Sequence, residues 1–174
     1  MRRLIPMLAL LAAAGCGAPP LTVDSDYDPS TDFAKYKTWN WMPGSKVDID
    51  SMTEQRIRTA IEAELPQHGL TKAGEGADLS VVIQISIQHK IKQSRATVGV
   101  GYSWGPAHVG VSGSPSKSYD EGTLILDLVD AKTKTLVWRG TAIGTVHKDY
   151  SPEERQERIR TAVYHLLEYY PPKK

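Results

Sequence analysis

The sequence predicts an α+β fold in which two helices pack on one face of a twisted antiparallel β-sheet. Residues 79–91 alternate between aliphatic and mostly polar side chains, as a strand with one buried face does. Residues 51–65 and 151–170 instead repeat apolar side chains at helical spacing. Because runs of strands are separated by single helices, the expected order is β-β-α-β-β-β-α within one antiparallel layer.

The stretch at residues 79–91 supplies most of the expected core. One face of this strand carries six aliphatic side chains, namely Leu79, Val81, Ile83, Ile85, Ile87 and Ile91. Burying all six would contribute roughly 9–18 kcal/mol before chain entropy is subtracted. His89 falls on the same face, and we expect it to be half-buried and hydrogen-bonded near the strand end.

Two further strands are expected before the first helix. Residues 22–27 predict the first strand, which the turn-forming residues 28–30 end. Residues 36–41 predict the second strand, with Trp39 and Trp41 on the same face.

Each helix carries signals for where it begins. Ser51 stands three residues before Glu54, the spacing of a capping box, and Pro66 marks the end of this helix. The last helix is expected to be capped by Ser151 and to have Pro152 in its first position.

The second half of the chain predicts two hairpins. Residues 97–118 are rich in glycine, and we expect a hairpin or loop there that turns near residues 105–106. Residues 122–129 and 136–143 predict a pair of strands joined by the polar turn at residues 130–134.

The N-terminus predicts a lipoprotein. Residues 1–15 combine a basic start with an apolar run too short to span a bilayer, as a signal peptide does. The run ends in Ala13-Ala14-Gly15-Cys16, which resembles a bacterial lipobox, so Cys16 is the expected lipidation site. Residues 16–21 would then form a lipidated tether before a single domain at residues 22–174. The alternative is an ordinary secretory signal that is cleaved after an alanine.

Composition agrees with a lipid anchor in the cell envelope. The chain of 174 residues contains one cysteine, so no disulfide can form within it, and acylation explains a thiol at the end of the signal. In bacterial lipoproteins, which this N-terminus resembles, a residue other than Asp after the cysteine implies the outer membrane, facing the periplasm, and Gly17 stands there. The net charge of +1 and the lack of aromatic residues near Lys90, Lys92 and Arg95 give no indication of nucleic-acid binding.

Several segments, in this order, resemble a known family of bacterial lipoproteins, called Domain of Unknown Function 4136. The segments are residues 24–28, 32–33 and 36–41, the glycine-rich middle, residues 136–140 and residues 170–172. The resemblance covers nearly the whole mature chain. It implies an envelope location and a fold, but it carries no catalytic residues, because the family is uncharacterised.

One motif raises the hypothesis of a serine hydrolase. Residues 101–105 match G-x-S-x-G around Ser103, and Asp127 and His147 follow in the order found in hydrolases of that type. The motif requires a strand, a sharp turn and a helix, whereas Pro106 and further glycines follow here. We therefore expect a protein that is not an enzyme.

No metal site or cofactor is expected. Asp24, Asp26 and Asp28 alternate and could suggest calcium, but an EF-hand loop from Asp24 needs glycine and glutamate where Pro29 and Lys35 stand. Alternating acids on an edge strand are instead typical of an edge kept unpaired.

Three functions follow from these observations. In the first, an anchored, non-enzymatic module contacts another envelope protein or the bilayer through residues 98–111, where Tyr102 and Trp104 stand among glycines. In the second, the aliphatic sheet face and the helices enclose a pocket for a small apolar ligand. The third is the hydrolase that uses Ser103.

Overall fold

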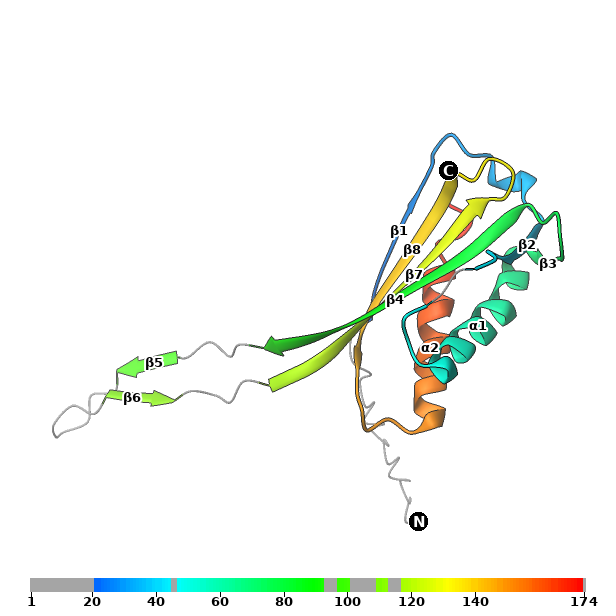
Figure 1. The fold of residues 1–174 in the computed structure, drawn as a ribbon. Helices are drawn as coiled ribbons and strands as arrows, with labels where there is room; N and C mark the ends of the chain where they lie inside the picture. The colour runs from blue at the N-terminus through cyan, green and yellow to red at the C-terminus, as the bar shows by residue number, and fades with distance from the viewer. Residues whose placement is uncertain (1–20, 45–46, 93–96, 101–108, 113–116, 174) are drawn as a thin grey trace, which may run out of the picture.

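A computed structural model shows a six-stranded sheet with two helices on one face (Figure 1). It describes residues 21–44, 47–92, 97–100, 109–112 and 117–173. The helices are α1 (Ser51–Glu64) and α2 (Pro152–Leu167), and short 3₁₀ helices occupy Phe33–Lys35 and Leu65–His68. The α+β class and the two helices on one face are therefore confirmed.

The strands of the main sheet follow the order β1-β8-β7-β4-β2-β3. Their bounds are β1 (Leu21–Tyr27), β2 (Thr38–Trp41), β3 (Thr71–Lys72), β4 (Leu79–Lys92), β7 (Lys117–Asp130) and β8 (Leu136–Val146). A separate antiparallel pair is formed by β5 (Thr97–Val100) and β6 (Val109–Ser112).

The prediction of a purely antiparallel sheet in the order β-β-α-β-β-β-α is wrong. β2 pairs in parallel with both β3 and β4, so the sheet is mixed, and the order gains β3 and the β5–β6 pair. The physical reason lies in α1, which follows β2 and is followed by the short strand β3 and then by β4. A helix between two neighbouring strands favours parallel pairing, because the helix carries the chain back along the sheet before the next strand begins.

Of the two predicted helix N-caps, the one for α1 is wrong and the one for α2 is confirmed. The expected capping box that begins at Ser51 is wrong, because Asp50 is the cap and its Oδ1 accepts a hydrogen bond from the Thr53 N–H at 3.0 Å. In α2 the expected cap is confirmed. The Ser151 hydroxyl accepts from the Glu154 N–H at 3.1 Å, and the Glu154 carboxylate accepts from the Ser151 N–H at 2.8 Å.

The core lies between the helices and one end of the sheet. Trp39 and Trp138 are fully buried on the inner face, where they meet the apolar stripes of both helices. The helix residues that contribute most are Ile57, Ile61, Val163, Leu166 and Leu167.

The expectation that all six aliphatic residues of β4 are buried is wrong at the far end of the strand. Ile83 is 1% exposed, whereas Ile87 is 53% and Ile91 64% exposed. Strands of 14 residues are about 46 Å long, but helices of 14 and 16 residues reach only about 21–24 Å. β4 and β7 therefore continue past the helices as a two-stranded extension (Figure 1).

Because the helices do not reach this part of β4, His89 is exposed to solvent and not half-buried as expected. Its Nδ1 lies 2.7 Å from Asp120 Oδ1 on the neighbouring strand β7. The expected hydrogen bond is present, but no helix covers this part of the sheet.

A glycine allows α2 to approach the sheet closely. A Cβ atom on Gly140 would lie 2.5 Å from Trp138 Cη2 and 2.7 Å from Leu166 Cδ2. Both neighbours are fully buried and have little room to move.

Gly140→Ala should therefore destabilise the protein by about 1–3 kcal/mol through overpacking. The matched control is Gly144→Ala on the same strand, whose Cβ would be 3.4 Å from Leu21 Cδ1 and should be nearly neutral. Urea denaturation of both variants measures the difference. Equal stability of the two would show that helix α2 does not depend on this glycine.

Substitutions in β4 test how far the core extends. Ile83→Ser should cost about 3 kcal/mol or more, because it leaves a cavity and buries a hydroxyl. Ile87→Ser, two residues along the same face, should cost less than about 1 kcal/mol. Thermal unfolding gives both values, and a large loss in Ile87→Ser would contradict the open end described above.

Candidate functional site

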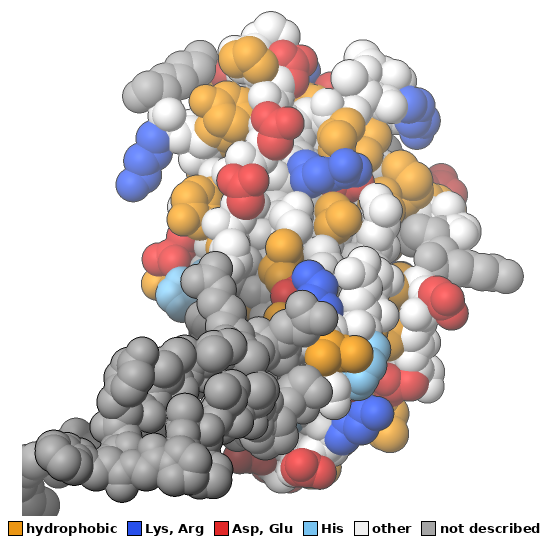
Figure 2. Space-filling view, turned by 90° about the vertical axis from the view of Figure 1, so that its left-hand side faces the viewer, with side chains coloured by type: hydrophobic (Ala, Val, Ile, Leu, Met, Phe, Trp, Pro, Cys, Tyr) orange, Lys and Arg blue, Asp and Glu red, His pale blue; other side chains and the backbone are white. Residues whose placement is uncertain are grey.

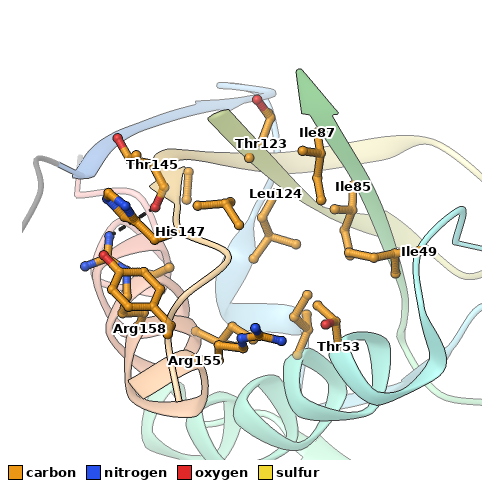
Figure 3. Close-up of a pocket in the computed structure, with 18 of the residues that line it drawn as sticks. Ile49, Thr53, Ile85, Ile87, Thr123, Leu124, Thr145, His147, Arg155 and Arg158 are labelled. Atoms are coloured by element: carbon orange, nitrogen blue, oxygen red, sulfur yellow. Dashed lines mark hydrogen bonds between the residues drawn. The ribbon is translucent and has the colours of Figure 1, made fainter. Parts of the chain in front are cut away.

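A hollow of about 300 Å³ lies where the helices stop covering the sheet (Figure 3). It opens between the first turns of α1 and α2 and the inner face of β4, β7 and β8. Ile85, Ile87 and Leu124 project from the strands toward the helices. The remaining apolar lining residues are Leu21, Ile49, Ile57, Ala142, Val146, Ile159 and Ala162.

Two glycines form part of the floor. Gly122 on β7 and Gly144 on β8 stand directly opposite each other in the strand register. A Cβ on Gly122 would lie 2.8 Å from Val146 Cγ2, and one on Gly144 would lie 3.4 Å from Leu21 Cδ1. Because neither residue has a side chain, Val146 packs over Gly122 and Leu21 lies beside Gly144, and these apolar side chains line the hollow together with the bare backbone of Gly144.

Basic side chains surround the mouth of the hollow. Arg155 Nη2 donates to the Lys148 carbonyl oxygen at 2.8 Å, and Arg158 Nη2 donates to the Thr145 carbonyl oxygen at 3.4 Å. The Arg158 guanidinium also lies 5.0 Å from the ring centre of Tyr150. Within the described residues, neither arginine has a carboxylate partner.

The other charges near the mouth have local partners. Asp50 caps α1, and the hydrogen bond from the Thr53 N–H lowers the pKa of its carboxyl group. Lys148 Nζ lies 3.6 Å from Asp120 Oδ2. The ring of His147 packs at 4.9 Å against that of Tyr150. The mouth therefore presents two guanidinium groups that form no ion pair with a carboxylate of the described residues.

A second hollow, of about 370 Å³, lies near the C-terminus. Its lining includes Phe33, Tyr36, His68 and Tyr170. The imidazole there is already engaged, since His68 Nδ1 lies 2.8 Å from the Tyr170 carbonyl oxygen and Nε2 lies 3.4 Å from Glu64 Oε1. The first hollow is the better candidate, because its lining combines apolar side chains with two arginines that have no carboxylate partner among the described residues.

The structure does not bring Asp127 and His147 together. Arg139 donates two hydrogen bonds to the Asp127 carboxylate, at 2.6 and 2.7 Å, on the sheet face away from the helices. His147 instead lies at the mouth of the hollow. Where described residues are visible on the sheet side of the molecule, hydrophobic side chains lie scattered between acidic and basic ones (Figure 2).

Several predicted site residues fall outside the described residues, namely Cys16, Tyr102, Ser103 and Trp104. Asp28 accepts hydrogen bonds from the Ser30 N–H and hydroxyl, whereas Asp24 and Asp26 are exposed on the edge strand β1. The described part of the chain contains no cluster of three or more potential metal ligands. None of its helices is long and apolar enough to cross a membrane.

A family model described as "Domain of unknown function (DUF4136)" matches residues 23–172, as the resemblance in the sequence implies. No curated protein matches the sequence.

Two solved structures share the fold at low sequence identity. The first is a PDZ domain protein from Parabacteroides distasonis, with 17% identity and a TM-score of 0.53 over 90% of this chain. This chain spans only 37% of the length of that protein. The second is the PelC dodecamer from Paraburkholderia phytofirmans, with 11% identity and a TM-score of 0.52 over 89% of this chain and all of the PelC chain. At these identities the likeness shows the fold alone.

Proposed function

The chain belongs to the DUF4136 family, and from this premise we propose that it is a lipid-anchored, non-enzymatic protein of the bacterial cell envelope that binds a small apolar ligand. The observation that carries the proposal is the hollow, with its apolar walls and the bare backbone of Gly144. Its volume of about 300 Å³ lies at the lower end of the range of ligand pockets. Each methylene group of a ligand buried there would contribute about 0.8 kcal/mol.

The position of the tether supports a ligand drawn from the membrane. Leu21 begins β1 and also lines the hollow, and Cys16 precedes it by five residues. Five extended residues span at most about 18 Å. A lipid on Cys16, which we place at the periplasmic face of the outer membrane, would therefore hold Leu21 and the hollow that it lines close to the bilayer. Contact of Tyr102 and Trp104 with an envelope protein stays a separate prediction.

Gly144→Val tests the binding site directly. The added side chain should fill the floor and weaken binding of the neutral fluorophore N-phenyl-1-naphthylamine by about tenfold or more, or roughly 1.4 kcal/mol. Valine suits a strand, so the melting temperature should be unchanged or higher. The matched control is Gly74→Val, since a Cβ at Gly74 meets nothing within 4 Å.

Fluorescence titration of full-chain protein carrying Cys16→Ser, in which no acyl chain or detergent competes, measures this binding. If the fluorophore binds equally to both glycine variants, the hollow is not its site. If it does not bind to the parent protein, the proposed function fails.

Cys16→Ser also tests the anchor. We expect the parent protein to fractionate with the outer membrane and the variant to lose that association, because the lipid provides the membrane affinity. Metabolic labelling with a fatty acid, followed by membrane fractionation, makes the comparison. Recovery of unlabelled parent protein free in the periplasm would contradict the anchor.

A further inference from the structure

Building on the proposed apolar site, we propose that its ligand is a single-chain amphiphile with an anionic head group, which Arg155 and Arg158 bind at the mouth of the hollow. The chain would lie over Gly144, beside Val146, and against the exposed side of Ile87. The head group would remain at the opening, in contact with water and with the two guanidinium groups.

The two arginines are placed to act on the same group. They stand three residues apart on α2, so they share one face of the helix, and both line the hollow. A guanidinium has five N–H donors, and each of these side chains uses Nη2 in one hydrogen bond to a backbone carbonyl. These bonds orient the guanidinium groups and leave donors available to an incoming anion.

Charge selects an anion over a neutral or cationic head group. Of the nearby carboxylates, Asp50 caps the first turn of α1 and Asp120 pairs with His89 and Lys148. On α2 itself, the Glu154 carboxylate accepts from the Ser151 N–H and Glu157 pairs with Arg160. The first turn of α2 is already satisfied by Ser151 and Glu154, so its backbone N–H groups are not the binding element. The arginines are therefore the donors that remain, and a guanidinium matches the oxygens of a carboxylate or phosphate in a planar, two-bond geometry.

The size of the hollow limits the apolar part. A volume of about 300 Å³ lies at the lower limit for ligand pockets, which favours one chain over several. The open side, along Ile87 and Val146, lets a chain longer than the hollow continue along the extension of β4 and β7. Selectivity should consequently depend more on the head group than on chain length.

Head groups of different charge on the same chain test this inference. The assay is displacement of N-phenyl-1-naphthylamine from the Cys16→Ser full chain by dodecanoate, dodecyl phosphate and dodecanol. We expect both anions to bind about tenfold more tightly than the alcohol, because only they form charge-assisted hydrogen bonds. The difference in affinity between the two anions and dodecanol should decrease as salt is added, because salt screens the charges. Inorganic phosphate alone should not displace the fluorophore, since it has no chain.

Variants then assign the effect to the arginines. Arg155→Gln combined with Arg158→Gln should remove the preference for the anions and leave dodecanol binding unchanged. Arg155→Lys combined with Arg158→Lys keeps the charges and should retain part of the preference. The control is Arg160→Gln on the same helix, an exposed residue that pairs with Glu157 and should behave like the parent protein.

The outcomes separate this inference from the function on which it rests. If dodecanol binds as tightly as dodecanoate, or if the double glutamine variant keeps the preference, the anionic head group is wrong, although an apolar ligand site stands. If inorganic phosphate displaces the fluorophore, the site binds a free anion rather than an amphiphile. If the fluorophore and all three chains fail to bind, the apolar site itself is refuted. The melting temperature of each variant, compared with that of the parent protein, tests whether the fold is intact.

Discussion

The difference in length between strand and helix determines the shape of this molecule. β4 and β7 each have 14 residues and extend about 46 Å, whereas the longer helix, of 16 residues, extends about 24 Å. Two helices side by side can cover only about half of such strands. The inner face is therefore a closed core at one end, a partly covered hollow in the middle and an exposed surface at Ile87 and Ile91.

The closed end is held by polar contacts as well as by packing. The carboxylate of Asp130, at the end of β7, accepts hydrogen bonds from the Thr133 and Lys132 N–H groups and from the Tyr36 hydroxyl, the last at 2.9 Å. These bonds, with that from Lys35, hold the pKa of Asp130 well below its ordinary value, against the opposing effect of burial. They connect the β7–β8 turn to the segment before β2. Beside the hollow, the contacts between α2 and the end of β8 are instead hydrogen bonds from Arg155 and Arg158 to the carbonyl oxygens of Lys148 and Thr145. Both arginines lie at the partly exposed end of the sheet.

Much of the fold could be predicted, since period-two and helical patterns located the strands around residue 83 and the helix from Ser151. The pattern at Ile87 is the same as at Ile83, because alternation shows which face a residue occupies and not whether anything covers it. Comparing strand and helix lengths could have revealed the uncovered end. The β2–α1–β4 arrangement carried a signal for parallel pairing, which the run of later strands obscured. Gly122 and Gly144 lie opposite each other because of the strand register, which the spacing of residues in the sequence does not determine.

The hollow also stands at the junction between the domain and its predicted anchor. Leu21 is the partner of Gly144 in the β1–β8 ladder, and its side chain lies within contact distance of where a Cβ on that glycine would be. A ligand lying on Gly144 would therefore touch the first residue of β1, directly after the tether. Filling the hollow would add apolar contacts to an edge strand that has a neighbour on one side only. If the proposed ligand and anchor are both present, binding of the ligand would act on the strand that follows the anchor, because the Leu21 side chain lines the hollow and also begins β1.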